Sequence, residues 1–134
     1  MSNYVSRFTI FRDDNAPIRF VYRDCLNDPL NGMTISRTNE QATEDMHLIA
    51  MLAPTSAKNL IEWSFDYDAQ GEIVFTNMEK EGAQVKFATP RRTDFDMKIV
   101  KYSPKGKATC VALLTHHQVG RLQARLERIR VRAN

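Results

Sequence analysis

Hydrophobic and polar residues alternate over two short segments near the start of the chain, SRFTIFR (residues 6–12) and PIRFVYR (residues 17–23). A period of two is typical of strands that bury one face. The DDNA segment between them favours a turn, because Asp and Asn accept turn conformations and a proline follows. We therefore predict that the chain begins with a β-hairpin, followed by a loop over DCLNDPLNG (residues 24–32).

The pattern then changes to a helical spacing in NEQATEDMHLIAML (residues 39–52). Apolar residues recur at intervals of four, three and four: Ala42, Met46, Ile49 and Ala53. Such intervals place the residues on one side of a helix. Pro54 follows, and it lacks the N–H that would continue the helical hydrogen bonds. We predict an internal helix that Pro54 ends.

Alternation returns in LIEWSFDYDAQGEIVFT (residues 60–76). Its apolar positions are Ile61, Trp63, Phe65 and Tyr67, each followed by a polar residue. This is the period of a half-buried strand, and Gly71 suits a turn before the chain returns over residues 73–76. We predict a hairpin here.

Two further strand patterns precede the end of the chain. AQVKFAT (residues 83–89) is a short strand pattern that stops at Pro90. DFDMKIVKY (residues 94–102) and ATCVALL (residues 108–114) are joined by SPKGK, whose proline and glycine favour a turn. The sequence therefore predicts a last hairpin with a basic tip.

The final segment, THHQVGRLQARLERIRVRAN, has the features of a helix. Thr115 and Gln118 have the capping-box spacing, in which each side chain satisfies a free backbone N–H at the helix start. An apolar row then occupies a band roughly 80° wide on the helix; its members are Val119, Leu122, Leu126 and Ile129. This row can cover the protein's own sheet, or it can pair with a second copy and make a homo-oligomer.

Together these elements predict a single domain over residues 1–134 of the α+β class. It comprises hairpins that form an antiparallel sheet of roughly six or seven strands, one internal helix and a basic amphipathic helix at the C-terminus. A length of 134 residues is sufficient for one hydrophobic core.

Composition is that of a globular protein, with 43% hydrophobic and 26% charged residues. No apolar run approaches the roughly 20 residues of a membrane span, and the first residues lack the apolar segment of a signal peptide. Cys25 and Cys110 are far apart and form no paired motif, which favours reduced thiols. We therefore expect no membrane association and a location in the cytoplasm of a bacterium or a host cell.

The net charge of +3 is unevenly distributed along the chain. Residues 1–85 carry 7 Lys and Arg against 13 Asp and Glu, a net charge of −6, whereas residues 86–134 carry 12 against 3, a net charge of +9. Such asymmetry favours a basic surface for an acidic partner. Folding could also mix the two sets of charges.

The C-terminal helix concentrates the positive charge in an arginine row that spans roughly 60° of the helix: Arg121, Arg125, Arg128 and Arg132. Like charges at these intervals weaken a helix slightly, so helix stability does not explain the row. Binding of phosphate would explain the row, because arginine binds phosphate with two hydrogen bonds. The alternatives are a solvated face and pairing with the acidic residues of the N-terminal part.

Basic residues also accompany aromatic residues on the predicted strands. The candidates around the last hairpin are Arg91, Arg92, Lys98, Lys101, Tyr102, Lys105 and Lys107, and those of the first hairpin are Arg7, Phe11, Arg19, Tyr22 and Arg23. Single-stranded nucleic acid suits such a surface, since its bases stack on rings while its phosphates meet Lys and Arg. The sequence thus predicts a site for single-stranded nucleic acid, in which Tyr22 and Tyr102 stack on bases.

Catalytic signatures are weak. His116 and His117 are neighbours and point about 100° apart on a helix, and His47 is remote from them in sequence. The pairs Asp66/Asp68 and Asp94/Asp96 could each hold Mg²⁺ in a nuclease, but they also fit the solvated side of a strand. No nucleophile motif or glycine-rich phosphate loop occurs. We expect no enzymatic activity, no metal, no cofactor and no small-molecule substrate.

The segment KIVKYSPKGKATCVALL followed by THHQVGRLQARLERIRVR resembles two kinds of protein in its architecture of strands and a basic helix. These are the whirly-type single-stranded-DNA-binding coactivators and the small single-stranded-DNA-binding proteins that some podoviruses use in early transcription and replication. The resemblance implies binding of single-stranded DNA without sequence preference, an oligomer and no cofactor, in a viral or cellular protein that aids replication or transcription. It covers about the last third of the chain and carries over no individual site residue.

The main hypothesis is therefore a non-enzymatic protein that binds single-stranded nucleic acid, DNA before RNA. The alternative is an adaptor whose basic C-terminal helix docks onto an acidic protein partner.

Overall fold

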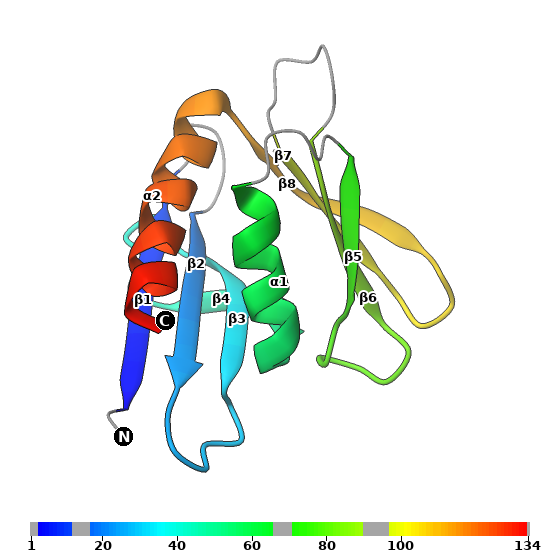
Figure 1. Cartoon of the computed structure of the whole chain (residues 1–134). Coiled ribbons are helices and arrows are strands. Elements are labelled where there is room, and N and C mark those ends of the chain that lie inside the picture. The colour runs from blue at the N-terminus through cyan, green and yellow to red at the C-terminus, as the bar shows by residue number, and fades with distance from the viewer. Residues whose placement is uncertain (1–2, 12–16, 66–70, 90–96, 134) are drawn as a thin grey trace.

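Two successive units of four strands and a helix make up the protein, as the computed structural model shows (Figure 1). The structure describes residues 3–11, 17–65, 71–89 and 97–133. The first unit consists of β1 (Tyr4–Ile10), β2 (Ile18–Asp24), β3 (Gly32–Thr38), β4 (Asp45–Leu52) and α1 (Pro54–Ser64). The second consists of β5 (Glu72–Thr76), β6 (Gln84–Ala88), β7 (Met97–Tyr102), β8 (Ala108–Leu114) and α2 (His116–Ala133).

Each unit forms its own antiparallel sheet, in which every strand pairs with its neighbour in sequence. We call β1–β4 the first sheet and β5–β8 the second sheet. The α+β class and the C-terminal helix of the prediction are confirmed, as are the first hairpin, the strand β6 and the last hairpin; an internal helix is present, but not at the predicted residues. The prediction of one sheet of six or seven strands is wrong, because β3 and β4 were not predicted and the strands divide into two sheets.

The predicted helix over residues 39–52 is wrong, because its second half is strand β4. A bulge opposite Ile35 and Ser36 inserts one residue into β4, so that the neighbours Ile49 and Ala50 are both buried. The bulge interrupts the alternation that would indicate a strand, and Met46, a member of the helical spacing, is 52% exposed. Ala42 has a φ of 57°, which belongs to a turn.

The predicted strand over residues 60–65 is also wrong, because this segment belongs to α1. Pro54 begins the helix instead of ending one, and a proline at the first helical position leaves no N–H unsatisfied. Ala57, Leu60 and Ile61 are buried at helical intervals. The returning strand of this predicted hairpin is confirmed as β5, whereas Tyr67 lies outside the described residues.

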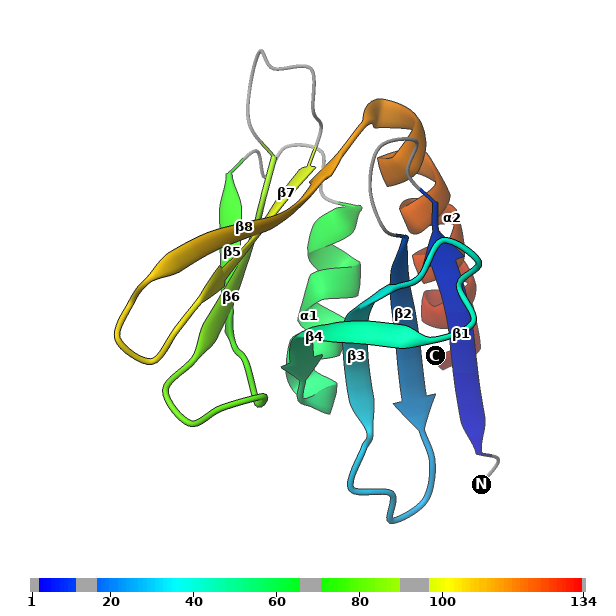
Figure 2. The ribbon, with the colours of Figure 1, turned by 180° about the vertical axis from the view of Figure 1, so that it is seen from behind.

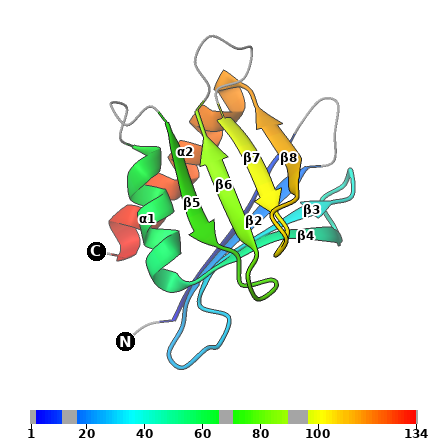
Figure 3. The ribbon, with the colours of Figure 1, turned by 90° about the vertical axis from the view of Figure 1, so that its right-hand side faces the viewer.

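Both helices lie between the sheets and pack against each other (Figures 1 and 3). Helix α1 contacts β3, β4 and β5, and α2 contacts β1 and β8. One hydrophobic cluster therefore joins both sheets and both helices, with Phe20, Phe87 and Leu126 among its buried members. Within the described residues, no helix is long and apolar enough to cross a membrane.

The beginning of α2 and its apolar row have the predicted local structure. The Thr115 N–H donates to Gln118 Oε1 at 2.9 Å, and the Gln118 N–H donates to Thr115 Oγ1 at 3.4 Å, which confirms the capping box. Leu122, Leu126 and Ile129 are buried, and Val119 packs at the margin of the core. The apolar row thus packs against the protein's own core, and the homo-oligomer stays a prediction.

Each sheet leaves the face away from the helices uncovered, and we call this its outer face. Figure 2 shows the outer face of the first sheet and Figure 3 that of the second sheet, with none of the described elements in front of either. Polar and charged residues alternate with the core residues on both, as expected for sheets that are buried on one side only.

Candidate nucleic-acid interface

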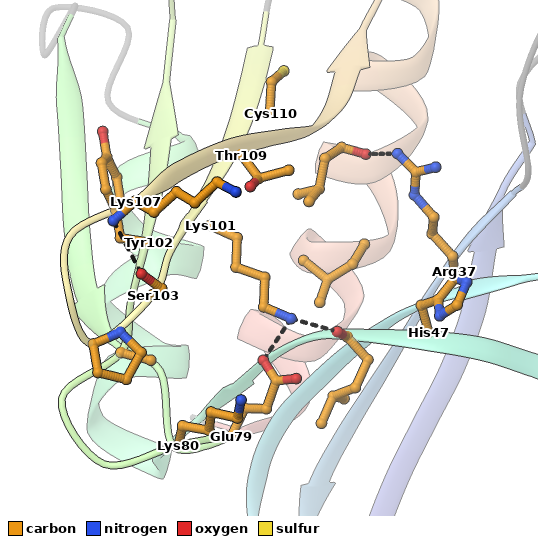
Figure 4. A pocket seen from close by; sticks show the side chains of 15 residues that line it. Arg37, His47, Glu79, Lys80, Lys101, Tyr102, Ser103, Lys107, Thr109 and Cys110 are labelled. Atoms are coloured by element: carbon orange, nitrogen blue, oxygen red, sulfur yellow. Dashed lines mark hydrogen bonds and ion pairs between the residues drawn. The ribbon is translucent and has the colours of Figure 1, made fainter.

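A hollow of about 660 Å³ lies between β4 and β8, which are edge strands of the two sheets (Figure 4). The turns between β5 and β6 and between β7 and β8 contribute to its wall. We call this hollow the intersheet groove. Its ionisable lining residues are Arg37, His47, Glu79, Lys80, Lys101 and Lys107. Four permanent cations thus face one carboxylate, which makes the groove positively charged.

Two long basic side chains hold the sheets together at the groove. Lys101 Nζ donates to the backbone oxygen of Leu48 at 3.0 Å and forms an ion pair with Glu79 at 2.6 Å. The Arg37 guanidinium donates to the backbone oxygen of Val111. The hydrogen bonds to Leu48 and Val111 each run from a side chain of one sheet to the edge strand of the other. These two cations therefore have a structural role in addition to their charge.

Asn77 fixes the wall of the groove at the start of the β5–β6 turn. Its side chain is buried and accepts from the Met51 N–H at 3.0 Å through Oδ1, while Nδ2 donates to the Ile49 oxygen at 3.0 Å. The Glu79 N–H also donates to Asn77 Oδ1 at 3.1 Å. A buried amide that satisfies three backbone groups in this way positions Glu79 beside Lys101.

The rim of the groove offers cations that remain available. Lys80 and Lys107 are exposed, and neither forms an ion pair with another described residue. Lys105 is exposed at the tip of the β7–β8 turn. Tyr102 lines the groove and is half-buried, with Lys86 Nζ 5.6 Å from the centre of its ring. The ring of Tyr102 and the exposed ammonium groups of Lys80 and Lys107 therefore all line the groove.

The two lysines of β7, Lys98 and Lys101, lie on opposite faces of the second sheet. Lys101 shares the inner face with Ile99, whereas Lys98 and Tyr102 lie on the outer face. The predicted group of Lys98, Lys101, Tyr102, Lys105 and Lys107 is therefore divided. Lys101, Tyr102 and Lys107 line the groove, and Lys98 lies outside it.

Tyr22 is not available to stack on a base. It is only 2% exposed, on the inner face of β2, and its ring lies 6.1 Å from that of Tyr4. Burial raises the pKa of the Tyr22 hydroxyl, with a further contribution from Asp24. The prediction for this residue is wrong because, by strand parity, Tyr22 belongs with the core residues Ile18 and Phe20. Phe11, at the end of β1, is 51% exposed.

The predicted arginines of the first hairpin share the outer face of the first sheet, on the side away from the core. Arg19 donates to Asp45 at 2.9 Å and also to the backbone oxygen of Ala42. Arg23 lies 4.0 Å from Asp28, and Arg7 is exposed. The register places Arg7 opposite Val21, beside the rows that hold the other two arginines. Two of the three cations thus already have carboxylate partners.

The arginine row of α2 is also divided by its contacts. The Arg125 guanidinium lies 5.3 Å from the centre of the Phe8 ring and donates to the backbone oxygen of Arg7 at 3.2 Å. Arg132 lies 5.4 Å from the centre of the Tyr4 ring. These two arginines pack on β1, where cation–π contact and the hydrogen bond stabilise the helix on the sheet.

Arg121 and Arg128, the other two members of the row, are exposed and form no ion pair with a described residue. Both belong to α2, and this helix lies across the molecule from the β7–β8 turn (Figure 1). The predicted residues Arg91 and Arg92 lie outside the described residues, as do Asp66, Asp68, Asp94 and Asp96. In the ranges that the structure describes, no group of three or more His, Cys, Asp or Glu side chains could hold a metal ion.

Sequence reasoning missed four basic side chains, namely Arg37, His47, Lys80 and Lys86. Arg37 and His47 lie on β3 and β4, which the sequence did not predict as strands. Lys80 stands between two glutamates in the MEKEG segment and has no excess of charge around it. The alternation in AQVKFAT did place Lys86 on the polar side of a strand, which was the available signal.

Comparisons with protein-family models, with curated proteins and with solved structures found no match to this chain, so a functional conclusion rests on the geometry of the site.

Proposed function

We propose that this protein binds single-stranded nucleic acid, without catalysis and largely without sequence preference, in the intersheet groove. The observation that carries the proposal is the composition of the groove, where four permanent cations face one carboxylate and an aromatic ring lies at the rim. Phosphate neutralisation by lysine and arginine is the dominant source of affinity for nucleic acid.

The roles of the residues follow from their contacts. Lys80 and Lys107 are exposed and pair with no carboxylate of the described residues, so they neutralise phosphates directly. Tyr102 presents a ring on which a base stacks, a contact worth about 1–3 kcal/mol per base. Lys101 and Arg37 contribute positive potential while they hold the sheets together. Stacking favours a single strand, because the bases of a duplex are already stacked on one another.

We give DNA before RNA, and replication or transcription before other processes, because of the resemblance of the last third of the sequence to single-stranded-DNA-binding proteins. The groove itself contains hydroxyl and carboxylate groups that can meet either sugar, so its geometry does not choose between the two polymers. The choice of DNA and the choice of replication or transcription are therefore both part of what we propose.

Fluorescence anisotropy tests it with labelled single-stranded DNA, double-stranded DNA and single-stranded RNA of equal length, each at low and at physiological salt. The expected result is binding of single-stranded DNA at micromolar or lower concentration, tighter than of the duplex and weaker at the higher salt. Absence of binding to all three polymers at low salt would overturn the proposal.

A second candidate function is an adaptor that docks through α2. It is favoured by the exposure of Arg121 and Arg128 and by Val131, three residues after Arg128, which is 67% exposed. An acidic partner with an apolar contact would suit this surface. Replacement of Tyr102 by alanine separates the two functions, because it weakens stacking on a base and leaves a partner of the helix unaffected.

A further inference from the structure

The outer face of the second sheet has features of a binding surface that the groove alone does not use. None of the described elements covers this face (Figure 3). The register places Lys86 opposite Val100, and Lys98 opposite Ala88 and Leu113, with both lysines pointing away from the core. Two cations and the ring of Tyr102 therefore occupy one uncovered side of β6 and β7.

Lys86 is held in place on this face. Its Nζ lies 3.3 Å from Glu72 and 5.6 Å from the centre of the Tyr102 ring. The interaction with Tyr102, and then that with Glu72, raises the pKa of Lys86, so this ammonium group stays charged throughout the neutral range. The contact fixes the position of the ring as well as that of the cation.

Small and apolar side chains surround these charges. Val74 is 44% exposed and lies opposite Lys86, whereas Val100 at the centre of the face is only 5% exposed. Ala88 and Ala108 are short, and Cys110 is exposed. The exposed apolar positions therefore lie around the charged side chains and not at the centre of the face.

This face is continuous with the intersheet groove. Tyr102 and Cys110 belong to both, since they line the groove and point to the outer side of β7 and β8. Lys98 stands four residues before Tyr102 on β7, which is about 13 Å along a strand. A polymer that fills the groove and stacks on Tyr102 therefore meets Lys86 and Lys98 next.

The first sheet provides the contrast. Its outer face carries three arginines, of which Arg19 and Arg23 have the carboxylates Asp45 and Asp28 as partners, and the exposed ring of Phe11 directly follows β1. On the second sheet, Glu72 is the one carboxylate among the described residues of the outer face; it pairs with Lys86, whereas Lys98 forms no ion pair with a described residue.

We propose that a single strand bound in the groove continues over the outer face of the second sheet, where Lys86 and Lys98 bind its phosphates and Tyr102 marks the junction between the two parts of the site. This inference rests on the proposed function and extends the site from the groove to the sheet. It implies that a short oligonucleotide fills the groove alone, whereas a longer one uses both parts.

The test is anisotropy with labelled oligothymidines of about 5 and about 20 nucleotides, within the range of single-strand site sizes. The variant is Lys86→Ala with Lys98→Ala. The matched control is Lys58→Ala with Arg121→Ala, which removes the same charge from exposed positions on α1 and α2. Circular dichroism melting verifies that every variant is folded.

For the longer strand, the Lys86/Lys98 variant should lose affinity on the order of tenfold, and the slope of log K against log salt should fall by about 1.4, at about 0.7 per phosphate contact. Its affinity for the short strand and both affinities of the control should change by less than about twofold. Equal loss for both lengths, or no loss for either, would overturn the extension while wild-type binding keeps the groove proposal intact. Absence of wild-type binding to both lengths would overturn both.

Lysine acetylation followed by mass spectrometry gives an independent readout. Lys86 and Lys98 should be protected by the longer oligothymidine and not by the shorter one, with Lys58 as an unprotected reference. Unchanged acetylation of Lys86 and Lys98 in the presence of the longer strand would contradict the extension.

Discussion

The two sheets have the same topology, but the basic residues on them differ in their partners. On the outer face of the first sheet, Arg19 and Arg23 are held by Asp45 and Asp28. Around the second sheet, Lys86 pairs with Glu72 and contacts the ring of Tyr102, whereas Lys80 and Lys107 form no ion pair with a described residue. The number of cations is therefore a poor guide to a site, because a cation that already has a partner contributes less to binding a polyanion.

The tyrosines show the same difference. Tyr22 of the first sheet is buried in the core, whereas Tyr102 of the second sheet is half-buried at the groove. The first sheet thus contributes mainly a core and one wall of the groove, and the second contributes most of the accessible chemistry. Substitutions at matched positions of the two sheets test this difference.

The largest expected effect comes from a pair of glycines with positive φ, one in each sheet region. Gly32 in β3 has a φ of +120°, and an added Cβ would lie 2.0 Å from the backbone oxygen of Leu52. Gly106 in the β7–β8 turn has a φ of +83° with no atom near an added Cβ. We expect Gly32→Ala to cost about 4 kcal/mol or more of unfolding free energy and Gly106→Ala about 1–2 kcal/mol, as measured by urea denaturation. Equal costs would show that contact with β4 does not restrict Gly32.

The tyrosines give the next largest effect. Tyr22→Ala should cost about 3–5 kcal/mol of unfolding free energy, because it empties a buried position. Tyr102→Ala should leave stability within about 1 kcal/mol and weaken binding of single-stranded DNA by about 1–3 kcal/mol. Denaturation and anisotropy on the same two variants measure both quantities. A Tyr102→Ala protein that binds as well as wild type would remove the stacking role.

An alkaline pH series tests the burial of Tyr22 separately. Its raised pKa means that the unfolded chain, with a value near 10.0, loses this proton at a lower pH than the folded protein does. The free energy of unfolding should therefore fall as the pH rises above about 10, by at most about 1.4 kcal/mol per pH unit from this group. Tyr22→Phe should reduce the fall, and an identical pH profile for this variant would contradict the assignment.

The smallest effect is expected from the paired arginine of the first sheet. Arg19→Ala should cost less than about 1 kcal/mol, as is usual for partly exposed ion pairs. It should change the affinity for single-stranded DNA by less than about twofold, because Arg19 lies outside the groove and is already paired. A loss comparable with that of Tyr102→Ala would show that the outer face of the first sheet also holds the strand.

Regular local patterns made part of the fold predictable. The alternation in β1, β2 and β7 and the capping box of α2 depend on neighbouring residues, and these predictions are confirmed. The segment of β4 failed because its bulge depends on pairing with β3, which the sequence does not display. The segment of α1 failed because Ile61 and Trp63 alternate with polar residues although the helix buries Ala57, Leu60 and Ile61.

The site was less predictable than the fold for a related reason. Lys101 and Lys107 were recognised from the charge of one hairpin, but Arg37 and His47 reach the groove through strands that the sequence did not predict. The regular intervals of the arginine row did not reveal that Arg125 and Arg132 would pack on the rings of Phe8 and Tyr4. Such contacts between remote segments depend on the tertiary arrangement.

The most direct test of the central claim compares two charge-reversal variants of equal net charge, Lys80→Glu with Lys107→Glu at the groove and Arg121→Glu with Arg128→Glu on α2. Anisotropy with single-stranded DNA at physiological salt measures both. The groove variant should lose affinity by more than about 30-fold and the helix variant by less than about threefold, since only the first reverses charges that contact phosphates. The opposite order, in a groove variant that is folded, would contradict the account and place the strand on the C-terminal helix.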